Sequence, residues 1–211
     1  MRLLSDAFQV APFDRYGWWR LLAKHCALPA KLAIARDEDD VAVLALAGSG
    51  QHLTQLGNWY TFRYRPILSP GADGPTMLKA LAQTLSTKAS RITLTGLPAD
   101  DAAHLTQAFQ ATGWLVWREQ CSVNHILPLN GRDYGTFLSD RPGKLRTTLK
   151  RKSGKVTTQV LSYFEADVWA AYEDIYAESW KPEEGSPAFL HAFAQAEGEA
   201  GRLRLGIAHD H

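Results

Sequence analysis

The sequence has few cysteines, no HExxH metal-binding motif and no long apolar run. Its two cysteines, Cys26 and Cys121, form neither a disulfide framework nor a ligand cluster, and its seven histidines show no HExxH spacing. Nowhere do about 18 apolar residues follow one another, and Ser5, Asp6 and Gln9 interrupt the N-terminal segment. We therefore expect a cytoplasmic protein with reduced thiols, no metal, no targeting segment and no membrane span.

The chain also has almost no net charge. Its 23 Lys and Arg residues against 22 Asp and Glu residues leave a formal net charge of +1, so no long-range field concentrates the molecule on nucleic acid or on an anionic membrane. Its 45% hydrophobic and 21% charged residues are typical of globular proteins, and 211 residues are enough for one large or two small domains. The composition therefore predicts an ordinary folded protein with a sizeable core.

One segment departs from this balance of charge. Residues 141–155, RPGKLRTTLKRKSGK, contain no acidic residue and seven basic ones: Arg141, Lys144, Arg146, Lys150, Arg151, Lys152 and Lys155. Leu145 and Leu149 have helical spacing, and the basic residues lie on both sides of this pair of leucines. Ser139 or Asp140 is suited to cap the start of the helix. The segment is therefore predicted to be a basic helix.

Two interpretations of this basic helix stay open. Lysine and arginine commonly occupy solvated helix positions, which favours a simple exposed face. Seven like charges close together repel one another, however, unless an anion or the acidic region after residue 155 compensates them. In the second interpretation Arg146, Lys150 and Arg151 contact phosphate or carboxylate groups.

Hydrophobic periodicity and turn residues predict the order of helices and strands. A first helix begins after Asp14, its expected N-cap. The expected strands that follow are 31–36, 41–47, 50–56, 58–68, 91–97, 114–120 and 122–129, and the expected helices are 75–88 and 100–113. From Asp133 a second series begins, which consists of the basic helix, a strand at 156–164, helices at 166–180 and from Ser186, and a strand at 202–209.

This order predicts an α/β fold of the mixed α+β kind. Alternating helices and strands imply a mixed sheet covered by helices, and the hairpins make the first part antiparallel. A single domain would not need a second start, so we expect one domain at 1–129 and another at 130–211. The side chains expected in the first core are Trp18, Leu22, Leu81, Leu85 and Phe109, and the helix 166–180 is expected to bury a stripe of apolar residues that includes Trp169 and Ile175.

Four segments carry a resemblance to a known family. At NWYTFRYRPIL, CSVNHILPL, RPGKLRTTLKRK and AESWKPEE the sequence resembles the GNAT-superfamily acyltransferases of the CelD (cellulose biosynthesis protein) type, which are related to the Fem-type aminoacyltransferases. The resemblance implies tandem GNAT-like units with mixed, largely antiparallel sheets. It also implies transfer of an acyl group from acetyl-CoA or another acyl-CoA to the nitrogen or oxygen of a small or cell-envelope-related acceptor.

In a GNAT unit, the resemblance further implies, the pyrophosphate of the donor binds backbone N–H groups at the start of a helix. The equivalent loop in the first half is LSPGADGPTML, residues 68–78. It departs from the family pattern because Asp73 would repel phosphate and Pro75 removes an N–H donor. A Gly- and Pro-rich turn is therefore the favoured interpretation of this loop.

In the second half, the acyl-binding strands and helix of the family should follow the strand 202–209. The sequence ends at His211, so we expect the second unit to be truncated. A strand without its next neighbour exposes an edge that can pair with another chain. Dimerisation of two copies through this edge and a longer natural chain are the two alternatives.

Further candidate site residues lie in two segments. Trp180 and Lys181 end a predicted helix and begin a loop that would cover a substrate, since function concentrates in loops. Asn58 and Tyr60 are interpreted as strand-edge packing or as acceptor contacts between the halves. No residue identifies itself as the catalytic base, and Glu178 is near the proposed loop only in sequence.

Three functions follow from these observations. The first is an acyl-CoA-dependent N- or O-acyltransferase with a small-molecule donor and acceptor. The alternative is a non-catalytic, degenerate GNAT module that binds a phosphorylated partner through residues 141–155. Nucleic-acid binding is disfavoured by the balanced charge and by the absence of aromatic residues from the basic segment.

Overall fold

The computed structural model describes residues 2–5, 7–121, 123, 125–180 and 185–210, which form two compact units. Unit 1 consists of Met1–Cys121 and Glu178–Phe193, and unit 2 consists of Ser122–Ala177 and Ala194–His211. The compact units are therefore not consecutive along the chain, whereas the sequence predicted one division after residue 129. The fold class is confirmed, because the described residues form seven α-helices and a mixed sheet that packs against helices.

The sheet of unit 1 is built around its second strand. The strands are β1 (Ala30–Asp37), β2 (Asp40–Ala47), β3 (His52–Gln55), β4 (Ile67–Leu68) and β5 (Arg91–Thr93). β1 and β2 form an antiparallel hairpin, and the other edge of β2 pairs antiparallel with β3 at one end and with β4 at the other. β5 pairs parallel with β3, so the sheet is mixed.

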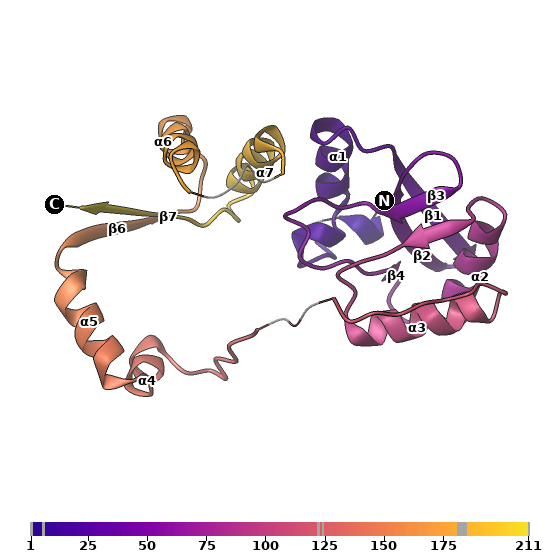
Figure 1. Cartoon of the computed structure of the whole chain (residues 1–211), viewed down its shortest axis with the longest axis horizontal. Coiled ribbons are helices and arrows are strands. Elements are labelled where there is room, and N and C mark those ends of the chain that lie inside the picture. Colours follow the sequence, from indigo (N-terminus) through magenta and orange to yellow (C-terminus); the bar gives the residue numbers. More distant parts are fainter. Residues whose placement is uncertain (1, 6, 122, 124, 181–184, 211) are drawn as a thin grey trace. The chain divides into compact units, whose positions relative to one another are not determined.

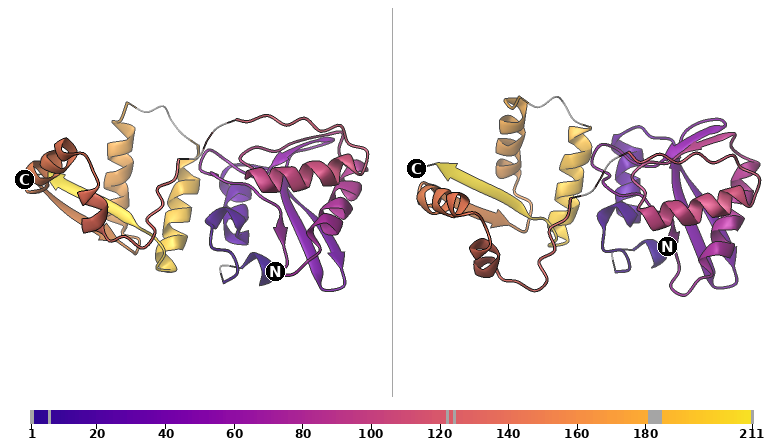
Figure 2. Two further views of the ribbon diagram at one scale, coloured as in Figure 1. Left: turned by 90° about the horizontal axis from the view of Figure 1, so that it is seen from below. Right: turned by 60° about the horizontal axis from the view of Figure 1, so that its bottom comes forward.

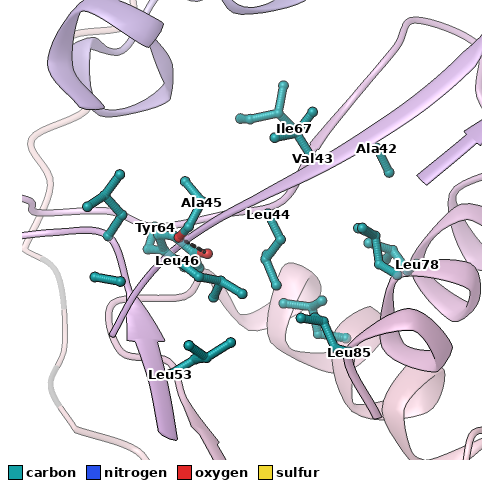
Figure 3. Packing of buried hydrophobic residues seen from close by; sticks show 14 of the residues in the cluster. Ala42, Val43, Leu44, Ala45, Leu46, Leu53, Tyr64, Ile67, Leu78 and Leu85 are labelled. Carbon is teal, nitrogen blue, oxygen red and sulfur yellow. Dashed lines mark hydrogen bonds between the residues drawn. The ribbon is translucent and has the colours of Figure 1, made fainter. Parts of the chain in front are cut away.

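Helices cover both faces of this sheet. They are α1 (Tyr16–His25), α2 (Gly74–Ser86) and α3 (Ala99–Gln110), with α1 on one side of the sheet and α2 and α3 on the other (Figures 1 and 2). All side chains of β2 from residue 42 to residue 47 are buried. Because strand side chains alternate between faces, Leu44 and Leu46 point toward Leu78 and Leu85 of α2, and Val43 points the other way (Figure 3).

The predicted core of the first unit is confirmed. Trp18 and Leu22 of α1, Leu81 and Leu85 of α2 and Phe109 of α3 are all buried. The start of α1 differs from the expectation, because Asp14 ends a short 3-10 helix (Pro12–Asp14) and Arg15 is the residue before the helix. The apolar spacing therefore predicted the buried face of α1, and the capping rule placed its first residue one position too early.

The segment 58–68 is a strand only at its end, so this prediction was largely wrong. Residues 57–66 form a loop between β3 and β4, in which the Tyr64 hydroxyl donates to the Ala45 carbonyl oxygen at 2.6 Å. The Leu56 N–H donates to the same oxygen at 2.9 Å. At Ala45, β2 thus accepts a hydrogen bond from the Tyr64 hydroxyl, whereas a neighbouring strand would have donated a backbone N–H.

The two strands predicted at 114–120 and 122–129 are also absent from the described residues. Trp114 turns toward the helices, with its Nε1 donating to the Ala82 carbonyl oxygen of α2 at 3.1 Å and its ring 5.3 Å from that of Phe109. Leu115 and Trp117 are then fully or almost fully exposed. The alternating pattern predicted strands, but the segment has no strand partner among the described residues.

Unit 2 contains a sheet of two strands. Its elements are α4 (Tyr134–Ser139), α5 (Gly143–Ser153), β6 (Val156–Leu161), α6 (Ala166–Ala177), the C-terminal part of α7 (Pro187–Glu199) and β7 (Leu205–Asp210). β6 and β7 pair antiparallel from Val156 opposite Asp210 to Leu161 opposite Leu205. α6 lies on one side of this pair, and α4 and α5 lie on the other (Figures 1 and 2).

Little of unit 2 is buried. Its buried apolar side chains among the described residues are Leu161, Trp169 and Ala194. The core-facing stripe predicted for the helix 166–180 is partly confirmed, because Trp169 is buried and Val168, Tyr172 and Tyr176 are partly buried, but Ile175 is 73% exposed. Each strand of the β6–β7 pair has one edge without a partner in the described part of the chain, because the sheet has no third strand there.

Candidate functional site

The basic segment forms the helix α5, as predicted, but it begins differently. Pro142 is the residue before the helix, and its carbonyl oxygen accepts from the N–H groups of Leu145 and Arg146 at 2.9 and 3.2 Å. Ser139 ends α4, and the Asp140 carboxylate binds Arg132 at 3.0 Å. Neither Ser139 nor Asp140 caps α5, because both belong to the end of the preceding helix.

The cations of α5 are accessible to solvent. Arg146, Lys150 and Arg151 are exposed, and within α5 only Thr148 is partly buried. In the described part of the chain, none of these three side chains forms an ion pair or a hydrogen bond with another side chain. Their N–H groups therefore remain available to an external anion.

Arg141 has a different role from the other bases of the segment. Its guanidinium carbon lies 4.4 Å from the centre of the Phe137 ring, and its Nε donates to the Phe137 carbonyl oxygen at 3.3 Å. This cation–π contact joins the end of α4 to the turn before α5. Arg141 thus stabilises local structure, and the available charge lies on the helix itself.

Two carboxylates lie at the N-terminus of α2, where a GNAT unit would hold pyrophosphate. The Asp73 side chain accepts from the Thr76 N–H at 3.3 Å and from the Thr76 hydroxyl at 2.7 Å. The Asp40 carboxylate accepts from the Asp73 N–H at 3.2 Å. The chain's own carboxylates therefore take up donors that a phosphate would need, and their charge repels an anion.

Asn58 and Tyr60 lie together in the loop between β3 and β4. The Asn58 side-chain oxygen accepts from the Tyr60 N–H at 3.1 Å and from the Thr61 hydroxyl at 3.2 Å. The Tyr60 ring is stacked on that of Phe189, with centroids 6.3 Å apart and planes at 6°. Both residues therefore stabilise the conformation of this loop.

The other predicted pair is only partly described. Trp180 is 91% exposed, and Lys181 lies outside the described residues. Asn58, Tyr60 and Trp180 belong to unit 1, whereas Arg146, Lys150 and Arg151 belong to unit 2. The structure brings Asn58 and Tyr60 together in unit 1, and it brings the three cations together on α5 in unit 2.

Sequence reasoning missed a cluster of charges in unit 1. The Asp14 carboxylate is 4% exposed and pairs with the Arg63 guanidinium, and Arg65 Nε lies 3.8 Å from an Asp101 carboxylate oxygen. Burial raises the pKa of Asp14, and Arg63 and Arg65 oppose this shift. The alternation in Arg63-Tyr64-Arg65 was a usable signal, since a buried Tyr64 puts its two neighbours on the opposite side.

No metal site and no membrane-spanning helix emerge from the described residues. No group of three or more His, Cys, Asp or Glu side chains is placed to hold a metal ion there. No helix in those parts is long and apolar enough to cross a membrane. No protein family, no curated protein and no solved structure matches this chain.

Proposed function

We propose that the chain takes part in acyl-CoA-dependent transfer of an acyl group to a small or cell-envelope-related acceptor, as a GNAT-superfamily protein of the CelD type. The observation that carries the proposal is the parallel pair of β3 and β5 in a sheet that is otherwise antiparallel, with α2 in the connection. A mixed, largely antiparallel sheet covered by helices is what the family resemblance implies for each GNAT-like unit.

Unit 1 is, in this proposal, a degenerate GNAT unit that does not hold the donor. Asp73 and Asp40 lie at the α2 N-terminus, where the pyrophosphate would have to bind. A carboxylate at that position stabilises the helix and repels a phosphate. The donor phosphates would instead meet the cations of α5 or a part of the protein outside the described residues.

Acyl transfer from a thioester requires few catalytic groups from the protein. The acceptor's amine or hydroxyl attacks the thioester carbon, the carbon–sulfur bond breaks, and the CoA thiol leaves with a proton. A base must accept the acceptor's proton, and N–H donors must stabilise the oxyanion. α5 contributes charge and not a base, so its proposed role is to bind and orient a phosphate-bearing ligand.

A second function is favoured by two observations: the cations of α5 have no side-chain partner in the described part of the chain, and Asp40 and Asp73 occupy N–H donors at the α2 N-terminus. A degenerate module without a donor site would use the same helix to bind a phosphorylated partner. Arg146, Lys150 and Arg151 would then make charge-assisted hydrogen bonds of roughly 1 to 3 kcal/mol each to the partner's phosphates. No acyl transfer would accompany this binding.

Calorimetric titration of acetyl-CoA and of adenosine 3′,5′-bisphosphate into the chain separates the two functions. A donor site binds acetyl-CoA more tightly, because the pantetheine and acyl groups add contacts. A phosphate-binding module binds both compounds with the same affinity. The triple variant Arg146→Ala, Lys150→Ala and Arg151→Ala should weaken either interaction, whereas the matched variant Arg20→Ala, Lys79→Ala and Lys88→Ala, with exposed bases of unit 1, should not.

The role of unit 1 is tested by the double variant Asp73→Asn and Pro75→Ala. We expect no gain in acetyl-CoA affinity, because no pyrophosphate binds at the α2 N-terminus. At an active cradle, removal of the negative charge and restoration of one N–H would tighten binding by about 1 to 2 kcal/mol. A several-fold gain would move the donor site into unit 1 and refute this part of the proposal.

A further inference from the structure

The cations of α5 are spread along the whole helix. Lys144 and Arg151 are two turns apart, a distance of roughly 10 Å at the rise of an α-helix. Arg146 and Lys150 lie one turn apart on the other side of the two leucines. A single phosphate group reaches only some of these side chains, so an extended array of anions is needed to contact all of them.

The segment around α5 keeps this charge uncompensated. Residues 130–155 contain eight basic and two acidic residues. Both acids are already engaged, because Asp133 caps α4 through the Thr136 N–H at 2.7 Å and Asp140 binds Arg132. The strongly positive part of the surface is therefore α5 and not α4.

Apolar side chains lie among these cations. Leu145 is 44% exposed and Leu149 is 41% exposed, one turn apart on α5. The long Lys and Arg side chains beside them can extend past these apolar groups to reach charged partners. A ligand that contacts α5 thus meets both positive charge and apolar surface.

We propose that α5 docks on a membrane surface that contains anionic lipids. The helix lies in the plane of the interface, with Lys144, Arg146, Lys150 and Arg151 on lipid phosphates and the two leucines at the edge of the acyl region. Charge complementarity and the exposed leucines favour lipid over nucleic acid. GKLRTTLKRKS contains no aromatic side chain on which a base could stack, and a phosphate backbone gains nothing from leucine.

This inference deepens the anion-binding role proposed above for α5, and it names the partner. It does not depend on acyl transfer, because a docked protein needs only an exposed helix. The two failures are distinguishable: binding of adenosine 3′,5′-bisphosphate tests the anion site, and binding of vesicles tests the lipid surface.

The experiment is sedimentation of the full chain with vesicles of phosphatidylcholine, with and without about one third phosphatidylglycerol. We expect binding to the anionic vesicles that falls steeply as salt rises, and little binding to pure phosphatidylcholine. Arg146→Gln, Lys150→Gln and Arg151→Gln together should lower the partition coefficient by on the order of 100-fold, roughly fivefold for each cation. The control variant Arg20→Gln, Lys79→Gln and Lys88→Gln changes the net charge equally and should bind like the wild type.

The leucines separate docking from simple charge attraction. Leu145→Ser with Leu149→Ser should lower the partition coefficient by about tenfold and leave the salt dependence unchanged. Circular dichroism of each variant confirms that the chain is folded. Equal binding to both kinds of vesicle, an undiminished triple variant, or binding to duplex DNA in place of anionic vesicles would overturn the proposal.

Discussion

Strands β2 and β6 show how differently the two units cover their strands. In β2 every residue from Val41 to Ala47 is apolar, and the strand is buried from Ala42 to Ala47. In β6, VTTQVL, half of the residues are polar, and only Leu161 is buried. β2 has strands on both edges and helices on both faces, and β6 pairs only with β7 among the described strands. The difference teaches that a continuous apolar run indicates a strand covered on both faces, whereas a half-polar strand remains largely exposed when it has only one neighbouring strand.

The same contrast holds for the helices. In α2 the predicted apolar face is completely buried, and in α5 the two leucines remain partly exposed. Stability is therefore concentrated in unit 1, while unit 2 keeps accessible the charged side chains that an external partner would need. A two-stranded sheet with few covering contacts is expected to contribute little stability alone.

The largest test of this comparison is a matched pair of core substitutions. Leu44→Ala in β2 removes a fully buried side chain and should lower the free energy of unfolding by about 2 to 5 kcal/mol. Leu149→Ala in α5 should change it by less than about 0.5 kcal/mol, because that side chain is already half in solvent. Urea unfolding followed by tryptophan fluorescence measures both. A similar loss for the two variants would mean that α5 is buried in solution.

In unit 1 the sequence predicted the helices and their buried faces better than it predicted which segments pair as strands. Spacing alone identified the buried faces of α1 and α2, because an amphipathic helix that packs against a sheet must bury its apolar side. It could not predict that Tyr64 would hydrogen-bond to Ala45 in place of a strand, since that contact depends on where the chain returns to β2. The strands at 114–129 failed for the same reason: pairing is a property of two segments.

Candidate site residues were predictable only where charge was local. The cations of α5 follow from seven bases in one short segment, and the structure leaves Arg146, Lys150 and Arg151 exposed. Asn58 was predicted to pack at a strand edge or to contact an acceptor, and its side-chain oxygen accepts hydrogen bonds within its own loop. The Asp14–Arg63 pair joins residues 49 positions apart, so the local alternation in Arg63-Tyr64-Arg65 marks the two arginines but does not identify Asp14 as a partner.

A smaller effect is expected for a buried hydroxyl. Tyr64→Phe removes the hydrogen bond to the Ala45 carbonyl oxygen, which keeps its second donor, the Leu56 N–H. The loss should be about 1.5 kcal/mol of unfolding free energy, because the bond lies in the core. Tyr134→Phe in unit 2 is the control, since that ring is exposed and its change should be close to zero. Equal effects would contradict the difference in burial.

The loss of stability caused by substitutions at the starts of helices should differ between the two units by a still smaller amount. Asp73→Ala removes the side-chain cap of α2 and should cost about 1 kcal/mol. Pro142→Ala removes no capping hydrogen bond from α5 and should cost less than about 0.5 kcal/mol. Thermal unfolding of the two variants under the same conditions measures the difference. A larger loss for Pro142→Ala would show that the start of α5 is more strongly determined than its contacts indicate.

The last difference concerns the pKa of two aspartates, and it is expected to be the smallest. Burial raises the pKa of Asp14 in unit 1, so its native form binds a proton more tightly than its unfolded form. The linked stabilisation is therefore present below the ordinary value of 3.8 and is lost as the pH rises through the raised native pKa. Hydrogen bonds from Thr136 lower the pKa of Asp133 in unit 2, so its stabilisation is present above 3.8 and is lost as the pH falls through the lowered native pKa.

Carboxyl-carbon NMR titration of the whole chain, with Asp14→Asn and Asp133→Asn for assignment, checks these opposite signs. Asp14 should titrate above 3.8 and Asp133 below it. Arg63→Gln should raise the pKa of Asp14 further, because Arg63 opposes the effect of burial, and it should leave Asp133 unchanged. If Asp14 titrated below its ordinary value, the Arg63 ion pair would outweigh burial at this site. Asp14 would then resemble Asp133 in the sign of its pKa shift, and the contrast between a closed unit 1 and an open unit 2 would fail at the most buried charge of unit 1.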